Sequence, residues 1–293
     1  MPEVPASVLS QYRACSLYNS PYPAHDRGCA VDLYPAGDRA PSPVAGRVVE
    51  TLTVRAPPKP FAPDHDHLVV IDTGAGEGPS YRTPGGEAAL ARILHVEPDV
   101  SPGDRVAVGD DLGTLVRAGF FAPWVATHLH RGVRDPGANV RRASGSLPLS
   151  LGVEPRPVEW DGTGTVVETA ETFAILDAPA HPGGGWAGLG SDDGAVLDGG
   201  LPHYEHGGVL GGASPGGSDP PSGATPAPAL LGTPLGEPSG RDCRWSDVLV
   251  RANGEPIVGL SLTLAREGWF VKLVARDHEF AVGDDVRVTV ERA

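Results

Sequence analysis

The stretch VSPGDRVAVGDDLG, residues 100–113, decides the fold class of this chain. Two Gly-Asp turns enclose a short apolar pair, and glycine adopts the positive φ angles that tight turns require. The stretch therefore predicts a compact hairpin-like element with almost no room for a helix. Working outward from it, the same alternation of short apolar runs and Gly, Pro or Asp turns continues in both directions.

Apolar runs of strand length recur along the whole chain. They cover residues 29–34, 46–52, 67–72, 89–96 and 112–116 in the first half, and 164–168, 172–176, 257–264 and 269–274 in the second. Runs of this length, separated by turn residues, are typical of β-sandwiches and barrels. We therefore expect an all-β protein, with an antiparallel β-sandwich or barrel-like domain followed by a second β-rich region.

The composition divides the chain into four parts. We expect a first domain over residues 10–150, a β-rich accessory region over 151–206, a Gly/Pro/Ser-rich linker or loop over 207–240, and a C-terminal β-rich region over 241–293. The third part offers little to bury, which favours a flexible segment. The last part is short for an independent sheet, so it could complete one sheet with residues 151–206.

The charge balance indicates the environment in which the protein works and limits the partners that it can bind. The net charge is −14, and among 23 basic residues only Lys59 and Lys272 are lysine. Such an acidic, lysine-poor chain is typical of a halophilic protein, whose carboxylates keep the surface hydrated in salt. The balance argues against nucleic-acid binding, which needs a basic surface. The first residues lack a signal peptide pattern and no apolar run has membrane-spanning length, so we expect a cytoplasmic location.

The tripeptide His128-Leu129-His130 carries the clearest chemical signal. In a β-strand alternate side chains point to the same face, so both imidazoles project together. Two histidines held in this way can share a metal site, one as ligand and the other as an acid, base or oxyanion partner. Taken alone, the tripeptide favours a surface strand that happens to carry two histidines.

What precedes this tripeptide changes that balance. His25 is followed by the strand residue Asp32, His95 lies late in an apolar strand, and the Gly-Asp turns then lead to His128-Leu129-His130. This order resembles the LytM-type (M23 family) zinc metallopeptidases of the duplicated hybrid motif fold. Their pattern is an early His and Asp, a middle His strand, a Gly-Asp turn and a terminal His-x-His strand. The resemblance covers about the first half of the chain.

The resemblance implies a zinc enzyme. Carried over by position, His25, Asp32 and His130 would bind Zn²⁺ and leave the fourth tetrahedral position to water. His95 and His128 would lie beside the metal as catalytic residues, orienting or deprotonating the water and stabilising the oxyanion. The implied reaction is hydrolysis of a peptide bond in a peptide or peptide-glycan substrate.

Three departures from the family pattern concern the site. The family's first pair is His-x-x-x-Asp, whereas His25 and Asp32 are seven residues apart, an odd spacing that faces opposite sides of one extended strand. A loop at Arg27-Gly28 could restore the geometry. Ile93 stands where the family has Tyr, and Arg131 where an aromatic residue follows the last histidine.

The other histidines predict no site. His65 and His67 have metal-like spacing in Asp64-His65-Asp66-His67, but we place them in a polar loop. His203 and His206 have the spacing of a second site, but they lie in a Gly-rich segment, where a solvated loop is the better interpretation.

Two other classes of function remain open from the sequence. A non-catalytic member of the same fold would bind a protein or glycan partner through the former cleft. A biotinyl/lipoyl-like or sugar-phosphotransfer carrier would share the Gly-Asp hairpins. No lysine occupies the hairpin tip of the first domain, which disfavours biotin or lipoyl attachment, and phosphotransfer would require phosphorylation of His95 or His128.

Overall fold

The computed structural model describes residues 1–75, 81, 86–211 and 227–293. These residues form short strands joined by turns, with helical structure limited to α1 (Ala6–Leu9), η1 (Pro23–Gly28) and η2 (Thr73–Ala75), which confirms the all-β fold class. Within this part of the chain, no helix combines the length and the apolar character needed to cross a membrane. The chain divides into two compact units.

The first unit comprises Met1–Cys15 and Tyr22–Val153. Its main sheet is antiparallel, in the order β3-β11-β7-β6-β5-β9, and a smaller antiparallel sheet has the order β4-β10-β8. The strands of these sheets are β3 (Ala30–Tyr34), β4 (Arg39–Pro41), β5 (Gly46–Arg55), β6 (His65–Asp72), β7 (Leu90–Leu94), β8 (Val96–Pro98), β9 (Arg105–Val106), β10 (Asp111–Leu115) and β11 (Leu129–Arg134). The parallel pair β1 (Glu3–Val4) and β12 (Ser150–Leu151) joins the ends of the unit, and β2 (Ala14–Ser16) leads out of it.

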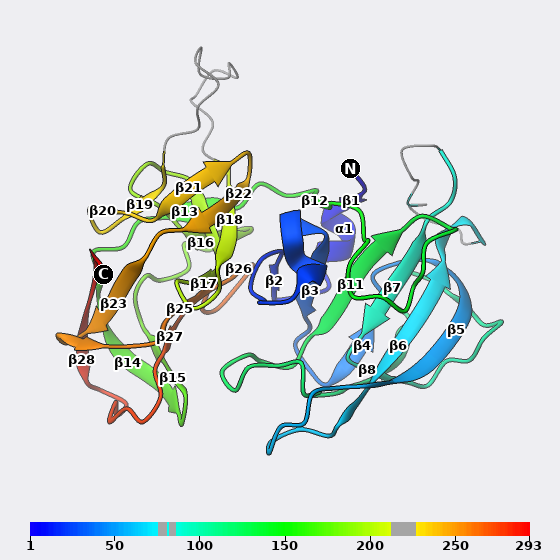
Figure 1. Ribbon diagram of the computed structural model, residues 1–293, viewed down its shortest axis with the longest axis horizontal. Helices are drawn as coiled ribbons and strands as arrows, with labels where there is room; N and C mark the ends of the chain where they lie inside the picture. The colour runs from blue at the N-terminus through cyan, green and yellow to red at the C-terminus, as the bar shows by residue number, and fades with distance from the viewer. Residues whose placement is uncertain (76–80, 82–85, 212–226) are drawn as a thin grey trace, which may run out of the picture. The chain divides into compact units, whose positions relative to one another are not determined.

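Strand β11 is the centre of the part of the sheet that matters for function. It lies between β3 and β7 (Figure 1), and all six of its residues are buried, so both faces of the sheet are covered there. On one face, Leu68, Val70 and Leu94 form an apolar cluster. Because side chains alternate along a strand, Asp66 of β6 lies on the same face as Leu68 and Val70. A polar site beside this cluster is therefore anchored in a packed sheet.

The turn-rich stretch 100–113 is only partly as predicted. Gly103, Gly109 and Gly113 have positive φ angles of 104°, 92° and 142°. The expected hairpin, however, is wrong: β9 pairs with β5, whereas β10 pairs with β4 and β8. The turns redirect the chain from one sheet to the other, because each short strand finds its hydrogen-bonding partner outside the stretch.

The second unit comprises Ser16–Pro21 and Glu154–Ala293. Its largest sheet has the order β21-β22-β18-β17-β25-β27-β15-β14-β28-β23-β24, so strands from before and after residues 207–240 share one sheet (Figure 1). The strands of the unit are β13 (Arg156–Val158), β14 (Thr163–Ala170), β15 (Phe173–Leu176), β16 (Ala187–Leu189), β17 (Val196–Leu201), β18 (His206–Leu210), β19 (Ala229–Leu230), β20 (Thr233–Pro234), β21 (Gly236–Ser239), β22 (Asp242–Trp245), β23 (Val248–Ala252), β24 (Glu255–Pro256), β25 (Gly259–Leu262), β26 (Leu264–Ala265), β27 (Val271–Val274) and β28 (Asp285–Arg292).

Residues 207–240, which we expect to be a linker or loop, contain strands at both ends. β18 covers their start, and β19, β20 and β21 lie towards their end. Gly207 and Gly208 pair with Cys243 and Asp242 of β22. Glycine is required at both positions because a Cβ would clash with the ring of Trp245 or of Tyr18. Residues 212–226, in the middle of the stretch, lie outside the described residues.

A short N-terminal segment is built into the second unit. Ser16 Oγ and the Leu17 backbone N–H donate hydrogen bonds to the two carboxylate oxygens of Asp198, at 2.5 and 2.7 Å. Asp198 is fully buried on β17. A buried carboxylate requires such donors, since burying an unpartnered charge is costly. The segment Ser16–Pro21 is therefore part of this unit despite its distance in sequence.

Candidate metal centre

The pairing of two strands brings Asp32 and His130 together. β3 and β11 are antiparallel neighbours, and Asp32 lies directly opposite His130 in their register. Directly opposite residues on one sheet face have Cβ atoms about 5 Å apart. His130 Nδ1 lies 3.0 Å from Asp32 Oδ1. This half of the site follows from strand pairing alone.

A sharp turn brings His25 to the same point. His25 lies in η1, which ends in a non-helical Asp26 (φ −52°, ψ 131°) and in Arg27 and Gly28 with φ of 56° and 62°. Two successive left-handed residues reverse the chain before β3 begins. His25 Nε2 consequently lies 3.1 Å from His130 Nδ1 and 3.3 Å from Asp32 Oδ1. The loop at Arg27-Gly28 thus overcomes the seven-residue spacing.

His25, Asp32 and His130 form a buried group that could hold a metal ion. Their donor atoms all lie within 4.8 Å of one another, and within the described residues this is the group of His, Cys, Asp or Glu side chains that meets that condition. Each side chain can direct a lone pair at the common centre. Three such atoms facing one another repel unless a proton or a cation lies between them.

The protonation states in this group favour a cation. Burial raises the pKa of Asp32, but the fields of His128 and His25 outweigh it and hold that pKa well below its usual range. Burial also lowers the pKa of His130 to about 3, against the opposing effect of Asp32. At neutral pH the group therefore contains a carboxylate and a neutral imidazole, which are the forms that bind metals.

His128 borders the group from the same strand end. Its Nδ1 donates a hydrogen bond to the Ala126 carbonyl at 2.8 Å, and its Nε2 lies 3.3 Å from Asp32 Oδ2. The alternation predicted for His128-Leu129-His130 holds, because both imidazoles contact the same carboxylate from one face. His130 contacts Oδ1 and His128 contacts Oδ2, so the two histidines occupy different positions.

His95 completes the group of five predicted residues. It directly follows β7, and its ring centre lies 5.4 Å from that of His128 and 5.9 Å from that of His130. All five side chains are buried, with residue exposures of 2–7%. The structure thus brings together every residue that the sequence singled out for the site.

Asp66 belongs to the site and was missed in the sequence. Its Oδ2 lies 2.6 Å from His95 Nδ1, and its side chain is fully buried. The sequence interpretation assigned Asp64-His65-Asp66-His67 to a polar loop, which is wrong, because β6 begins at His65. The sequence does carry a signal for Asp66. It alternates with Leu68 and Val70, so the buried face of the strand extends two residues further towards its start.

The remaining candidate histidines lie elsewhere. His65 and His67 occupy the other face of β6, with ring centres 5.7 Å apart, and His65 is about half exposed at 51%. His203 and His206 belong to the second unit, where His206 begins β18 rather than lying in a loop. Burial lowers the pKa of His203 to about 4.

An aromatic segment covers the site. The ring centre of Phe121 lies 4.6 Å from those of both His95 and His128, and Phe120 stacks edge-on against Tyr22 at 5.7 Å. Arg117 fixes this segment, because its guanidinium donates to the carbonyls of residues 122, 123 and 125. We call residues 116–127 the aromatic cover. Phe121 of this segment thus lies directly against two of the buried imidazoles.

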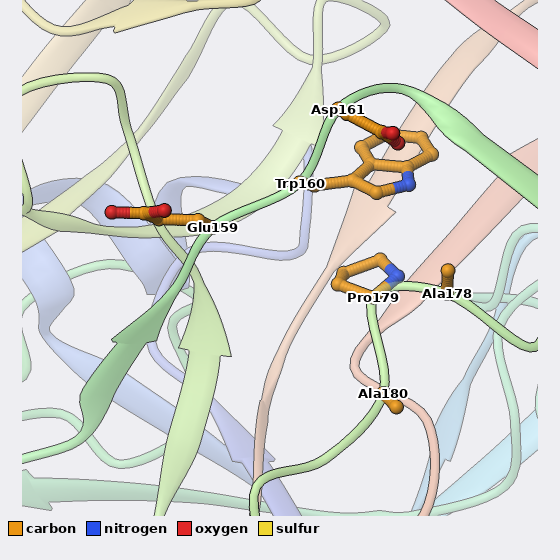
Figure 2. A pocket seen from close by; sticks show the side chains of 6 residues that line it. All are labelled: Glu159, Trp160, Asp161, Ala178, Pro179 and Ala180. Atoms are coloured by element: carbon orange, nitrogen blue, oxygen red, sulfur yellow. The ribbon is translucent and has the colours of Figure 1, made fainter.

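The second unit has a surface pocket of its own (Figure 2). Its lining residues are Glu159, Trp160, Asp161, Ala178, Pro179 and Ala180. Figure 2 shows the Trp160 ring beside Asp161, with Pro179 facing it across the pocket. Asp161 already accepts hydrogen bonds from the backbone and hydroxyl of Thr163, and the Trp160 indole donates to the carbonyl of Thr163. These polar groups stabilise a turn, and the lining has no His or Cys.

Comparison with known proteins yields a family but no relative of known activity. The N-terminal domain of a family described as Domain of unknown function (DUF8155) matches residues 3–151, and its C-terminal domain matches residues 156–291. No curated protein and no solved structure matches the chain. The gap between the two matches, residues 152–155, contains the boundary between Val153 and Glu154 at which the compact units divide. The chain therefore belongs to the DUF8155 family, and it contains both the N-terminal and the C-terminal domain of that family.

Proposed function

We propose that the first unit is a zinc-dependent metallopeptidase that hydrolyses a peptide bond in a peptide or peptide-glycan substrate. The observation that carries the proposal is the convergence of His25 Nε2, Asp32 Oδ1 and His130 Nδ1. Their separations are 3.0, 3.1 and 3.3 Å. Ligand atoms at the usual zinc distances of about 2.0–2.1 Å are about 3.4 Å apart in a tetrahedron. The group therefore needs to expand by only a few tenths of an ångström.

The donor set supports a catalytic rather than a structural zinc. Two imidazoles and one carboxylate leave the fourth tetrahedral position open, as catalytic zinc sites do. When bound, the metal would supply a Lewis acid that lowers the pKa of water and polarises the scissile carbonyl. Structural zinc sites, in contrast, have four protein ligands. The described residues offer three at this point.

The chain's own residues would perform the remaining steps. Asp32 holds its negative charge in a buried site, and its second oxygen orients His128. His95 and His128 lie next to the ligands, where imidazoles can accept a proton from water or donate to the developing oxyanion. The aromatic cover must move aside to admit a peptide, because the five side chains are 2–7% exposed.

The first test is metal content and hydrolysis measured on the same preparation. Protein purified without chelator is expected to contain one zinc per chain by elemental analysis and to cleave glycine-containing peptides, with both properties lost in a strong chelator and restored by zinc. His130→Ala and Asp32→Ala should each abolish zinc binding. His67→Ala is the matched control, because this histidine lies on the opposite face of β6 and should keep the zinc. Metal-free protein that gains no zinc would contradict the proposal.

A second candidate is a non-catalytic member of the same fold, in which zinc stabilises a binding module. The burial of all five side chains, with Phe121 packed against His95 and His128, favours it. Such a module would bind zinc at one equivalent and gain thermal stability, but it would leave every peptide intact. Stoichiometric zinc with no hydrolysis would therefore select this candidate.

A further inference from the structure

Asp66 is a buried carboxylate whose two oxygens have different partners. Oδ1 accepts a hydrogen bond from the backbone N–H of His67 at 2.7 Å, whereas Oδ2 lies 2.6 Å from His95 Nδ1. Its residue exposure is 0%. A charge buried this deeply requires strong hydrogen bonds, so the contact with His95 is a central one. The backbone N–H of His67 fixes Oδ1 of Asp66, and this also fixes Oδ2 in its position towards His95.

His95 is held in an unusual backbone conformation. Its φ is 68°, in the left-handed region that non-glycine residues avoid, and it lies between the end of β7 and the start of β8. Its carbonyl accepts a hydrogen bond from the Val116 N–H at 2.8 Å. Non-glycine residues in the left-handed region are strained and cluster at functional sites, where the surroundings enforce them. Backbone and carboxylate therefore both direct this imidazole.

We propose that Asp66 is a positioning residue that keeps the proton of His95 on Nδ1, so that Nε2 presents a lone pair to the site. The consequence for hydrolysis rests on the proposed function, but the tautomer itself does not. A carboxylate can only accept a hydrogen bond, so the partner nitrogen must carry the proton. A carboxylate that accepts a hydrogen bond from one ring nitrogen fixes the histidine in the same way in many metal sites and in catalytic triads.

The proton balance of the step is then closed. Nε2 of His95 accepts a proton from the attacking water as its oxygen bonds to the carbonyl carbon. When the C–N bond breaks, the same proton passes from Nε2 to the leaving amine. Nδ1 of His95 keeps its own proton throughout and donates it in a hydrogen bond to Asp66 Oδ2. No oxidant, reductant or further co-reactant is required.

Asp66→Asn reverses this arrangement without changing the shape of the side chain. The His67 N–H requires an oxygen, so the amide oxygen must take the place of Oδ1. The amide nitrogen then faces His95 Nδ1 and donates to it. His95 would be driven to carry its proton on Nε2, where it can no longer accept one from water. An exchange of one oxygen for one nitrogen thus tests the tautomer directly.

The primary measurement is the ¹⁵N NMR spectrum of the histidine side chains in the zinc-loaded protein. We expect His95 to be protonated on Nδ1 in the unaltered protein and on Nε2 in Asp66→Asn, with His67→Ala, which retains the backbone donor, behaving like the unaltered protein. Protonation of His95 on Nε2 in the unaltered protein would overturn the inference. This measurement on the unaltered protein decides the matter even if Asp66→Asn fails to fold.

Kinetics supply the second readout. Asp66→Asn is expected to lower kcat about 100-fold or more, the usual contribution of a general base, with KM and zinc content unchanged. An unchanged kcat in a variant whose tautomer has switched would overturn the role in hydrolysis. If the unaltered protein cleaves no peptide, the proposed function fails, while the tautomer measurement still decides what Asp66 does.

Discussion

Two buried carboxylates, one in each unit, are satisfied in opposite ways. Asp198 in the second unit accepts hydrogen bonds from a hydroxyl and a backbone N–H, so the folded chain itself provides its donors. Asp32 in the first unit instead faces three imidazoles, two of which converge on one of its oxygens. In the first arrangement, each carboxylate oxygen has a donor from the chain, and these hydrogen bonds stabilise the fold. The second gathers lone pairs around one point and could hold a cation there.

Removing Asp198 should have the largest effect on stability. Asp198→Ala leaves the Ser16 hydroxyl and the Leu17 N–H buried without this acceptor, and each lost bond to a charged group is worth about 1.5–3 kcal/mol. We expect the second unit to lose about 3 kcal/mol of unfolding free energy in a denaturant titration. The zinc content of the first unit should stay at one per chain, since Asp198 belongs to the other unit.

If Asp198→Ala also loses zinc, then Asp198 supports the site as well as the fold, and the contrast between Asp198 and Asp32 is wrong. Asp242→Asn is a milder control in the same unit. It preserves an acceptor for the Tyr18 hydroxyl, which lies 2.6 Å from Asp242 Oδ1, and should cost much less than Asp198→Ala.

The pH dependence of stability should be next in size. The pKa of His130 falls from 6.5 to about 3 on folding, because burial disfavours the charged imidazole. Between pH 6.5 and 3 the unfolded chain therefore binds a proton that the folded chain does not, so stability falls as pH falls, by about 1.4 kcal/mol per pH unit for one such group. Asp32, with a lowered pKa, adds a loss in the same direction below about pH 4.

The measurement is the unfolding free energy of the metal-free protein at several pH values from 7 to 4. His130→Gln should reduce the slope of unfolding free energy against pH by the amount expected for one titrating group. His203 of the second unit, whose pKa is lowered to about 4 by burial, contributes a slope of the same sign, and His203→Gln measures that share separately. A slope that neither variant changes would show that other groups control the acid sensitivity.

Loosening the aromatic cover should have the smallest effect, and mainly on rates. Arg117→Ala removes the donors to three carbonyls of residues 122–125, with little change at the sheet. We expect a chelator to extract zinc several-fold faster, as followed by a colorimetric indicator, with an unfolding free energy lower by about 1 kcal/mol. Arg141→Ala is the control, because its exposed ion pair with Glu50 lies outside the cover and exposed pairs contribute little. Equal extraction rates in both variants would show that the cover does not limit access.

The sequence singled out the five residues through their order along the chain, which resembles that of the LytM-type zinc metallopeptidases, and local patterns supported two parts of that set. The alternation in His128-Leu129-His130 places two imidazoles on one face, and an apolar run around Asp32 predicts the neighbouring strand. It failed at the Gly-Asp turns, which join strands of different sheets rather than a hairpin. Turn residues specify where the chain bends, but the strand partner depends on hydrogen bonds far away in sequence.

Asp66 shows the same limit at the scale of one side chain. Its neighbours His65, Asp64 and His67 make the segment polar on average, which indicated a loop. Only the pairing of β6 with β5 and β7 determines that the strand begins at His65 and that Asp66 faces the apolar cluster. The partner that justifies a buried carboxylate, His95, is 29 residues away and lies at a left-handed turn.

By itself, the sequence determined the all-β character of this protein and the histidines and aspartate that could share a metal. The first depends on period-two patterns and turn residues, which act over a few residues, whereas the second depends on the resemblance of the residue order to that of the LytM-type metallopeptidases. Only the tertiary structure decided that His25 reaches Asp32, that Asp66 holds His95, and that Ser16–Pro21 belongs to the second unit. These contacts join residues whose sequence spacing carries no signal, because a turn with positive φ or a strand pairing sets the distance between them.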